Sequence, residues 1–149
     1  MAKSSLEKRL RWAEGKLKKW LARHGVELPL VNIIVDPSLE EETLATHRHL
    51  DTIVVRETSV PESVIAHELV HIAQRTLEQF RGFRLLYTLL AEGLAEWVTK
   101  QLYPQHEVKY PIGYRLIELL VETDKRVIDD LLRLNDLPLV PENVEAMLR

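Results

Sequence analysis

Residues 59–71 predict the central helix of this chain and read Ser59-Val-Pro-Glu-Ser-Val-Ile-Ala-His-Glu-Leu-Val-His71. Ser59 is a residue type that caps helix N-termini, Pro61 suits a first turn, and Glu62 has the capping-box spacing from Ser59. The residues that follow are apolar almost all round, which indicates a buried helix. We expect this helix to span residues 61–80.

Two histidines and a glutamate of this helix, His67, Glu68 and His71, have the spacing of a metal site. Residues four apart in an α-helix lie about 6 Å apart along the axis on nearly the same face, so the two imidazoles can bind one metal ion. Glu68 would lie beside them, placed to take a proton from a water molecule that the metal activates. The alternative is an ordinary pair of surface histidines, although burying such groups without partners is costly.

A third metal ligand is available in the segment Leu90-Ala-Glu92-Gly-Leu-Ala-Glu96-Trp97. We expect a helix over residues 83–103, folded back antiparallel to the histidine helix, which brings Glu92 level with the metal. Catalytic zinc usually has three protein ligands and a water molecule, and Glu92 would complete that set. Glu92 and Glu96 share one helix face, and the alternative for them is a pair of surface carboxylates. Gly93 is unfavourable inside a helix, which indicates close packing or space for a ligand.

The beginning of the chain predicts a basic amphipathic helix over residues 5–24. Ser4 and Glu7 have the spacing of a capping box, and Gly25 would stop the helix. The apolar positions of this segment recur at helical spacing and form one stripe. We expect the whole chain, residues 1–149, to form a single domain.

The rest of the chain completes a mainly helical α+β fold. β-branched runs predict a small early sheet with strands at residues 31–35 and 52–56. C-terminal helices are expected within residues 111–149, at 111–123, at 125–134 and once more near the end.

The composition narrows the classes of function. The 149 residues include no cysteine, so any metal must be held by histidine and carboxylate. The net charge of −3 argues against a general nucleic-acid binder. No apolar run approaches the roughly 18 residues of a membrane span, and no secretory signal is recognisable. We therefore expect a cytoplasmic protein.

The charge is spread unevenly along the chain. Residues 1–25 carry eight Lys/Arg and two Glu, a balance of +6, which leaves −9 for the remainder of the total of −3. The simplest interpretation is a solvated helix face that complements an acidic body, and the alternative is a surface for an anionic partner or membrane. Trp12 and Trp20 on the same helix would also suit a homodimer through it.

His67-Glu-x-x-His71, followed about twenty residues later by Glu92-Gly-x-Ala on a helix, resembles the gluzincin zinc metallopeptidases. At this chain length the resemblance is closest to their single-domain members, the minigluzincins, and it covers about residues 52–120. It implies a minimal zincin-like domain, Zn²⁺ as the cofactor, Glu92 as the third zinc ligand and Glu68 as the general base.

Two further residues enter through the same resemblance. Glu96 would orient a ligand histidine, which we take to be His67. Tyr110-Pro-Ile-Gly resembles the Tyr-x-x-Gly segment of aminopeptidase N-like gluzincins, in which the tyrosine hydroxyl donates to the oxyanion. Tyr114 and His106 are alternative donors, and a tyrosine that merely packs at a helix start is a further alternative. The chain lacks the substrate-amine motifs of that group, so an aminopeptidase is not predicted.

We assign no function to the other histidines of the chain. His24 follows the first helix and is expected to be solvated. His47 and His49 lie two apart in an expected polar loop, where they could bind adventitious metal. None of the three is assigned to the metal site.

The sequence therefore predicts a zinc-dependent peptidase that acts on a peptide or protein substrate. Glu68 would be the general base, Tyr110 would stabilise the oxyanion, and the substrate would lie antiparallel to an edge strand at residues 52–56. One alternative is a zinc-binding regulatory or interaction module with little turnover. Another is a latent peptidase specific for one regulator protein. The resemblance to minigluzincins also implies that a terminal segment can block the cleft, and the tail from Leu137 could serve as that segment.

Overall fold

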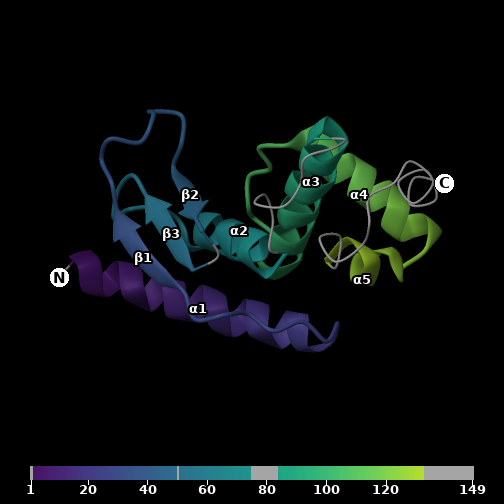
Figure 1. Ribbon diagram of the computed structural model, residues 1–149, viewed down its shortest axis with the longest axis horizontal. Coiled ribbons are helices and arrows are strands. Elements are labelled where there is room, and N and C mark those ends of the chain that lie inside the picture. Colours follow the sequence, from purple (N-terminus) through teal and green to yellow (C-terminus); the bar gives the residue numbers. More distant parts are fainter. Residues whose placement is uncertain (1, 50, 75–83, 133–149) are drawn as a thin grey trace.

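The structure is a computed structural model in which residues 2–49, 51–74 and 84–132 are described (Figure 1). They form five helices and one three-stranded sheet, which confirms the predicted mainly helical α+β fold with a small early sheet. In chain order the elements are α1 (Ala2–Ala22), β1 (Asn32–Val35), β2 (Ala45–Arg48), β3 (Thr52–Val55), α2 (Glu62–Ala73), α3 (Arg84–Leu102), α4 (Pro111–Thr123) and α5 (Val127–Leu132). Within these residues no helix combines the length and the apolar character needed to cross a membrane.

The sheet has the strand order β1-β3-β2, with β3 parallel to β1 and antiparallel to β2. β1 and β3 occupy the two predicted runs. β2 lies where the sequence predicts a loop, because Ala45-Thr-His-Arg has little of the apolar alternation that marks a strand. The prediction of residues 52–56 as an edge strand is wrong: β3 is central, and β2 forms the edge.

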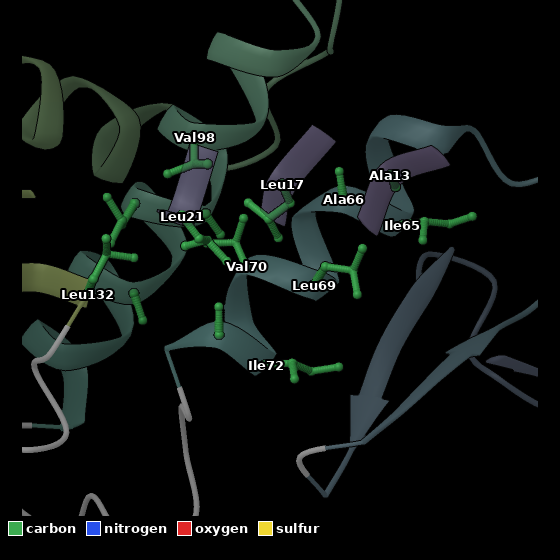
Figure 2. Close-up of a cluster of buried hydrophobic side chains, with 14 of the residues drawn as sticks. Ala13, Leu17, Leu21, Ile65, Ala66, Leu69, Val70, Ile72, Val98 and Leu132 are labelled. Carbon is green, nitrogen blue, oxygen red and sulfur yellow. The ribbon is translucent and has the colours of Figure 1, made fainter. Parts of the chain in front are cut away.

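α1 and α2 pack against each other and form the centre of the hydrophobic core (Figure 2). α1 contributes the predicted apolar stripe, in which Trp20 is partly buried and the other members are buried: Leu6, Leu10, Ala13, Leu17 and Leu21. α2 contributes buried apolar side chains on most of its faces: Ile65, Ala66, Leu69, Val70 and Ile72. Each large apolar side chain stabilises the fold by roughly 1.5–3 kcal/mol when fully buried. α2 is therefore held firmly, and its polar residues with it.

α1 begins earlier than predicted. Ser4 lies inside the helix, so the predicted capping box of Ser4 and Glu7 is wrong. The predicted stop is confirmed, because Gly25 has a φ of 68°, a conformation that glycine adopts without strain. His24 is not simply solvated: its Nδ1 lies 2.6 Å from Asp129 Oδ1 and ties the end of α1 to α5.

The outer face of α1 carries one large exposed apolar side chain. Trp12 is 60% exposed, whereas Trp20 packs edge-on against Trp97. Arg11 pairs with a glutamate one turn later at 2.8 Å, and Arg9 donates to backbone carbonyls just before α2. Part of the basic charge is thus used within the domain, and a homodimer through this face stays a prediction.

α2 begins without the predicted side-chain cap. Pro61 occupies the N-cap position, and its carbonyl accepts hydrogen bonds from the amides of Val64 and Ile65. The Ser59 hydroxyl instead donates to the Glu57 carboxylate at 3.2 Å. The predicted capping box is wrong because Ser59 lies two residues before the N-cap position.

α3 and α4 follow the predicted ranges 83–103 and 111–123. α5 begins two residues later than the helix predicted at 125–134, and residues 133 and 134 of that prediction lie outside the described residues. α3 contacts α2 on one side and α4 on the other (Figure 1). Residues 75–83 and 133–149 lie outside the described residues. The predicted extension of the histidine helix to residue 80, the final helix and the blocking tail fall there.

Candidate metal centre

α2 and α3 bring two histidines and a glutamate to one point. The spacing of four residues in α2 places His67 and His71 side by side, with their Nε2 atoms 3.1 Å apart. α3 places Glu92 opposite them, with its Oε2 atom 3.0 Å from His67 Nε2 and 3.1 Å from His71 Nε2. Both histidines are buried, and the Glu92 side chain is 20% exposed. The three atoms form a nearly equilateral triangle.

The triangle fits a metal ion. A tetrahedral ion with bonds of about 2.0–2.1 Å separates its ligand atoms by roughly 3.3–3.4 Å, which is close to the observed spacing. Nitrogen and oxygen lone pairs that converge in this way repel one another unless a proton or a metal ion lies between them. The described residues thus include a His/Glu group close enough to bind a metal ion. Its imidazole and carboxylate donors suit zinc and other divalent ions.

Glu96 lies buried behind the triangle, one helical turn after Glu92. Its Oε1 atom is 2.7 Å from His67 Nδ1, and its Oε2 atom accepts hydrogen bonds from the backbone amides of Lys109 at 2.6 Å and Tyr110 at 3.4 Å. The contact with His67 is close but poorly aligned, so this Nδ1 is the one buried side-chain nitrogen or oxygen of the described residues without a hydrogen bond. At 2.7 Å the two groups still attract each other electrostatically. Glu96 thus joins a candidate ligand to the segment before α4.

A second group with metal-binding proximity consists of His67, Glu96 and His106. His106 is already engaged through both nitrogens: Nδ1 contacts the Ser63 hydroxyl and Nε2 contacts Glu96 Oε1, each at 3.0 Å. Glu96 also accepts from two backbone amides, so a metal ion would have to displace existing hydrogen bonds. We therefore interpret this group as a network that supports His67. His106, an alternative oxyanion donor in the sequence analysis, has no uncommitted nitrogen for that role.

The charges of the site favour a bound cation. Burial opposes protonation of His67, but contacts with the carboxylates of Glu92 and Glu96 outweigh it and raise its pKa to about 9. Burial also opposes ionisation of Glu92, yet hydrogen bonds from His67 and His71 lower its pKa to about 2. Against burial again, contacts with His106 and His67 hold the pKa of Glu96 well below its ordinary range. A proton or a metal ion can supply the positive charge that these carboxylates demand.

Glu68 lies next to the triangle and contacts a residue that the sequence analysis missed. Its Oε2 atom accepts a hydrogen bond from His47 Nδ1 at 2.9 Å. The His47 ring also stacks on that of His71, with centroids 5.3 Å apart. Only a prediction of β2 as a strand facing α2 could have found this contact, and the polar sequence of β2 gave no such signal.

Tyr110 lies at the N-terminus of α4 and lines the cleft above the site. It is 45% exposed, and its ring lies nearly parallel to that of His67, with centroids 6.2 Å apart. The negative charge of Glu92, together with burial, raises the pKa of Tyr110 and keeps its hydroxyl protonated. Tyr114 does not line the cleft as far as the described chain forms it.

α3 and α4 meet backbone to backbone at Gly93 and Gly113. A Cβ atom at Gly93 would lie 2.3 Å from the Gly113 carbonyl oxygen, and one at Gly113 would lie 2.8 Å from the carbonyl oxygen of Leu89. Close packing at Gly93, one of the two predicted reasons for this glycine, is confirmed. Because Gly93 follows Glu92 and Gly113 lies three residues after Tyr110, this contact sets the distance between the candidate ligand and the tyrosine.

An open cleft of about 1120 Å³ lies over the triangle. Residues 42–47, which include most of β2, form one wall, and residues 103–110 contribute to another. His67, Glu68, His71 and Glu92 also line it. A cleft of this size exceeds the usual volume of a small-molecule pocket and has room for several residues of an extended peptide.

Comparison of the chain with protein-family models, with curated proteins and with solved structures found no match.

Proposed function

We propose that this protein is a zinc-dependent peptidase of the gluzincin type. One observation carries the proposal: two imidazole nitrogens and a carboxylate oxygen lie within 3.0–3.1 Å of one another beside an open cleft. His67, His71 and Glu92 would hold the ion. Glu68 follows His67 directly in α2 and lines the same cleft.

Zinc at this position would act as a Lewis acid and lower the pKa of a water molecule towards about 7. Glu68 would accept the proton of the attacking water and pass it to the leaving amine. Tyr110 lines the cleft with its ring beside that of His67, and its hydroxyl would donate to the oxyanion. Glu96 would keep the His67 ring oriented while His67 binds the ion through Nε2.

The edge strand β2 is the best candidate for substrate alignment. β2 pairs with β3 on one side, and residues 43–47 line the cleft. An extended peptide could add to this edge through main-chain hydrogen bonds, which give affinity without a demand for particular side chains. This replaces residues 52–56 as the proposed docking strand.

The test compares zinc-loaded wild-type protein with Glu68→Gln on a mixed peptide library analysed by mass spectrometry. We expect Glu68→Gln to keep its zinc and to lose about 10²–10⁴-fold in turnover, because a general base contributes about that factor. Glu42→Gln is the matched control, since it removes an exposed carboxylate of the cleft wall. Full activity in Glu68→Gln would refute the mechanism. A wild-type protein that binds zinc but cleaves no peptide would favour a zinc-binding module.

A further inference from the structure

We propose that His47 is a positioning residue for Glu68: its Nδ1–H group holds one carboxylate oxygen of the general base so that the other faces the cleft. This inference rests on the proposed function for its catalytic meaning. The contact that it invokes can be measured without any turnover.

The hydrogen bond has a definite direction. An ionised carboxylate only accepts hydrogen bonds, so His47 must be the donor, at 2.9 Å from Glu68 Oε2. The side chains are 10% and 11% exposed, respectively, and a hydrogen bond to a charged group is strong in such partly buried surroundings. Glu68 lines the cleft, so its other oxygen, Oε1, is the one that would take the proton.

The imidazole of His47 is itself fixed from two sides. Its ring stacks on His71 at an interplanar angle of 28°. Its backbone lies in β2, where His47 pairs with Ile53 of the central strand. A side chain held by a strand and by a stacked ring can impose one orientation on the carboxylate, and a general base needs such precision to lie about 2.6–3.2 Å from the proton that it takes.

The same strand would align the substrate. If the peptide adds to the edge of β2, the scissile bond and the base are both placed by β2, one through main-chain pairing and the other through His47. A shift of β2 would then move substrate and base together. Removing the His47 donor should disturb proton transfer more than substrate binding.

Two variants at His47 separate its hydrogen bond from its bulk. His47→Leu fills similar space without a donor, whereas His47→Asn offers an amide N–H at the position of Nδ1. We expect His47→Leu to lower kcat about 10–100-fold, which corresponds to the loss of one hydrogen bond to a charged group. KM should stay within about twofold, zinc content should stay unchanged, and His47→Asn should recover most of the loss.

Arg48→Gln is the matched control on the same strand. Arg48 pairs with Asp36 on the exposed surface, at 2.8 Å, and does not line the cleft in the described part of the chain. The kcat of Arg48→Gln should stay within about twofold of wild type. Full kcat in zinc-loaded His47→Leu, or equal losses in the Leu and Asn variants, would overturn the positioning role.

Ring ¹⁵N NMR of histidine-labelled protein, loaded with zinc at one fixed pH, tests the contact itself. We expect His47, assigned by the loss of its signals in His47→Asn, to carry its proton on Nδ1. In Glu68→Leu the proton should move towards Nε2, the nitrogen that a free neutral imidazole prefers. An Nε2-protonated His47 in the wild type, or no response to Glu68→Leu, would overturn the proposal. If the NMR result is as expected but the zinc-loaded wild type shows no peptidase turnover, only the proposed function is refuted.

Discussion

Replacing Gly93 with alanine tests the packing that joins the two helices around the site. The added Cβ atom would lie 2.3 Å from the Gly113 carbonyl oxygen and 2.5 Å from its carbonyl carbon. Carbon and backbone atoms in ordinary contact lie about 3.5–4.0 Å apart, so α4 must move by roughly 1 Å or more at this point. The atoms in the way belong to backbone, which cannot rotate aside as a side chain can.

The change in the free energy of unfolding of Gly93→Ala follows from two opposing effects. Alanine is favoured over glycine inside a helix by about 1 kcal/mol, whereas overpacking a tight interface usually costs about 1–3 kcal/mol. Because Gly93→Ala forces α3 and α4 apart, its overpacking cost should lie towards the upper end of that range, with a net loss of about 1–2 kcal/mol in the free energy of unfolding. Gly15→Ala in α1 is the matched control, because a Cβ atom there meets nothing within 4 Å. It should gain up to about 1 kcal/mol.

Urea unfolding followed by circular dichroism measures both variants against wild type. We expect the midpoint to fall for Gly93→Ala and to rise for Gly15→Ala, with equal slopes. A Gly93→Ala protein as stable as Gly15→Ala would show that α3 and α4 do not meet at these glycines, and the reasoning about the spacing of Glu92 and Tyr110 would fail with it.

Three further predictions concern the charges and the hydroxyl of the site. In metal-free protein, the ion pair of His67 and Glu92 should stabilise the fold fully between about pH 4.5 and 6.5, the ordinary pKa values of the two groups. This stabilisation is lost as the pH falls through the Glu92 pKa of about 2 or rises through the His67 pKa of about 9. A flat profile of urea midpoints against pH in the presence of chelator would contradict it. Glu96→Gln removes the charge behind His67 and should weaken zinc binding about 10–100-fold in a chelator competition, whereas unchanged affinity would mean that Glu96 does not support the ligand. Tyr110→Phe should keep its zinc and lose about 10²–10³-fold in kcat, and full kcat would exclude its hydroxyl as the oxyanion donor.

Local sequence signals were sufficient wherever one element determines the geometry. The spacing of His67 and His71 predicts that they share a helix face, and their Nε2 atoms lie 3.1 Å apart. The apolar stripe of α1, the strands β1 and β3 and the bounds of α4 likewise follow from residue patterns. The placement of Glu92 needed the additional assumption that two helices pack antiparallel, and its Oε2 atom does lie against both histidines.

Contacts made by tertiary pairing left no such signal. β2 is a strand because β3 pairs with it, and its four residues do not alternate between apolar and polar. His47 therefore looked like a loop residue, although it contacts Glu68, 21 positions later. His106 reaches Glu96 from a loop after α3, and Ser59 failed as a cap because the chain enters α2 through Pro61. In each case the deciding neighbour comes from a fold that residue spacing alone does not specify.

The most direct measurement is the zinc content per chain, by elemental analysis after zinc loading and desalting against a weak chelator. The triangle of His67, His71 and Glu92 predicts about one zinc ion per chain in the wild type and in Glu42→Gln, and a loss of that zinc in Glu92→Ala. A wild-type protein that takes up no zinc, or a Glu92→Ala protein that retains it fully, would contradict the assignment of this centre.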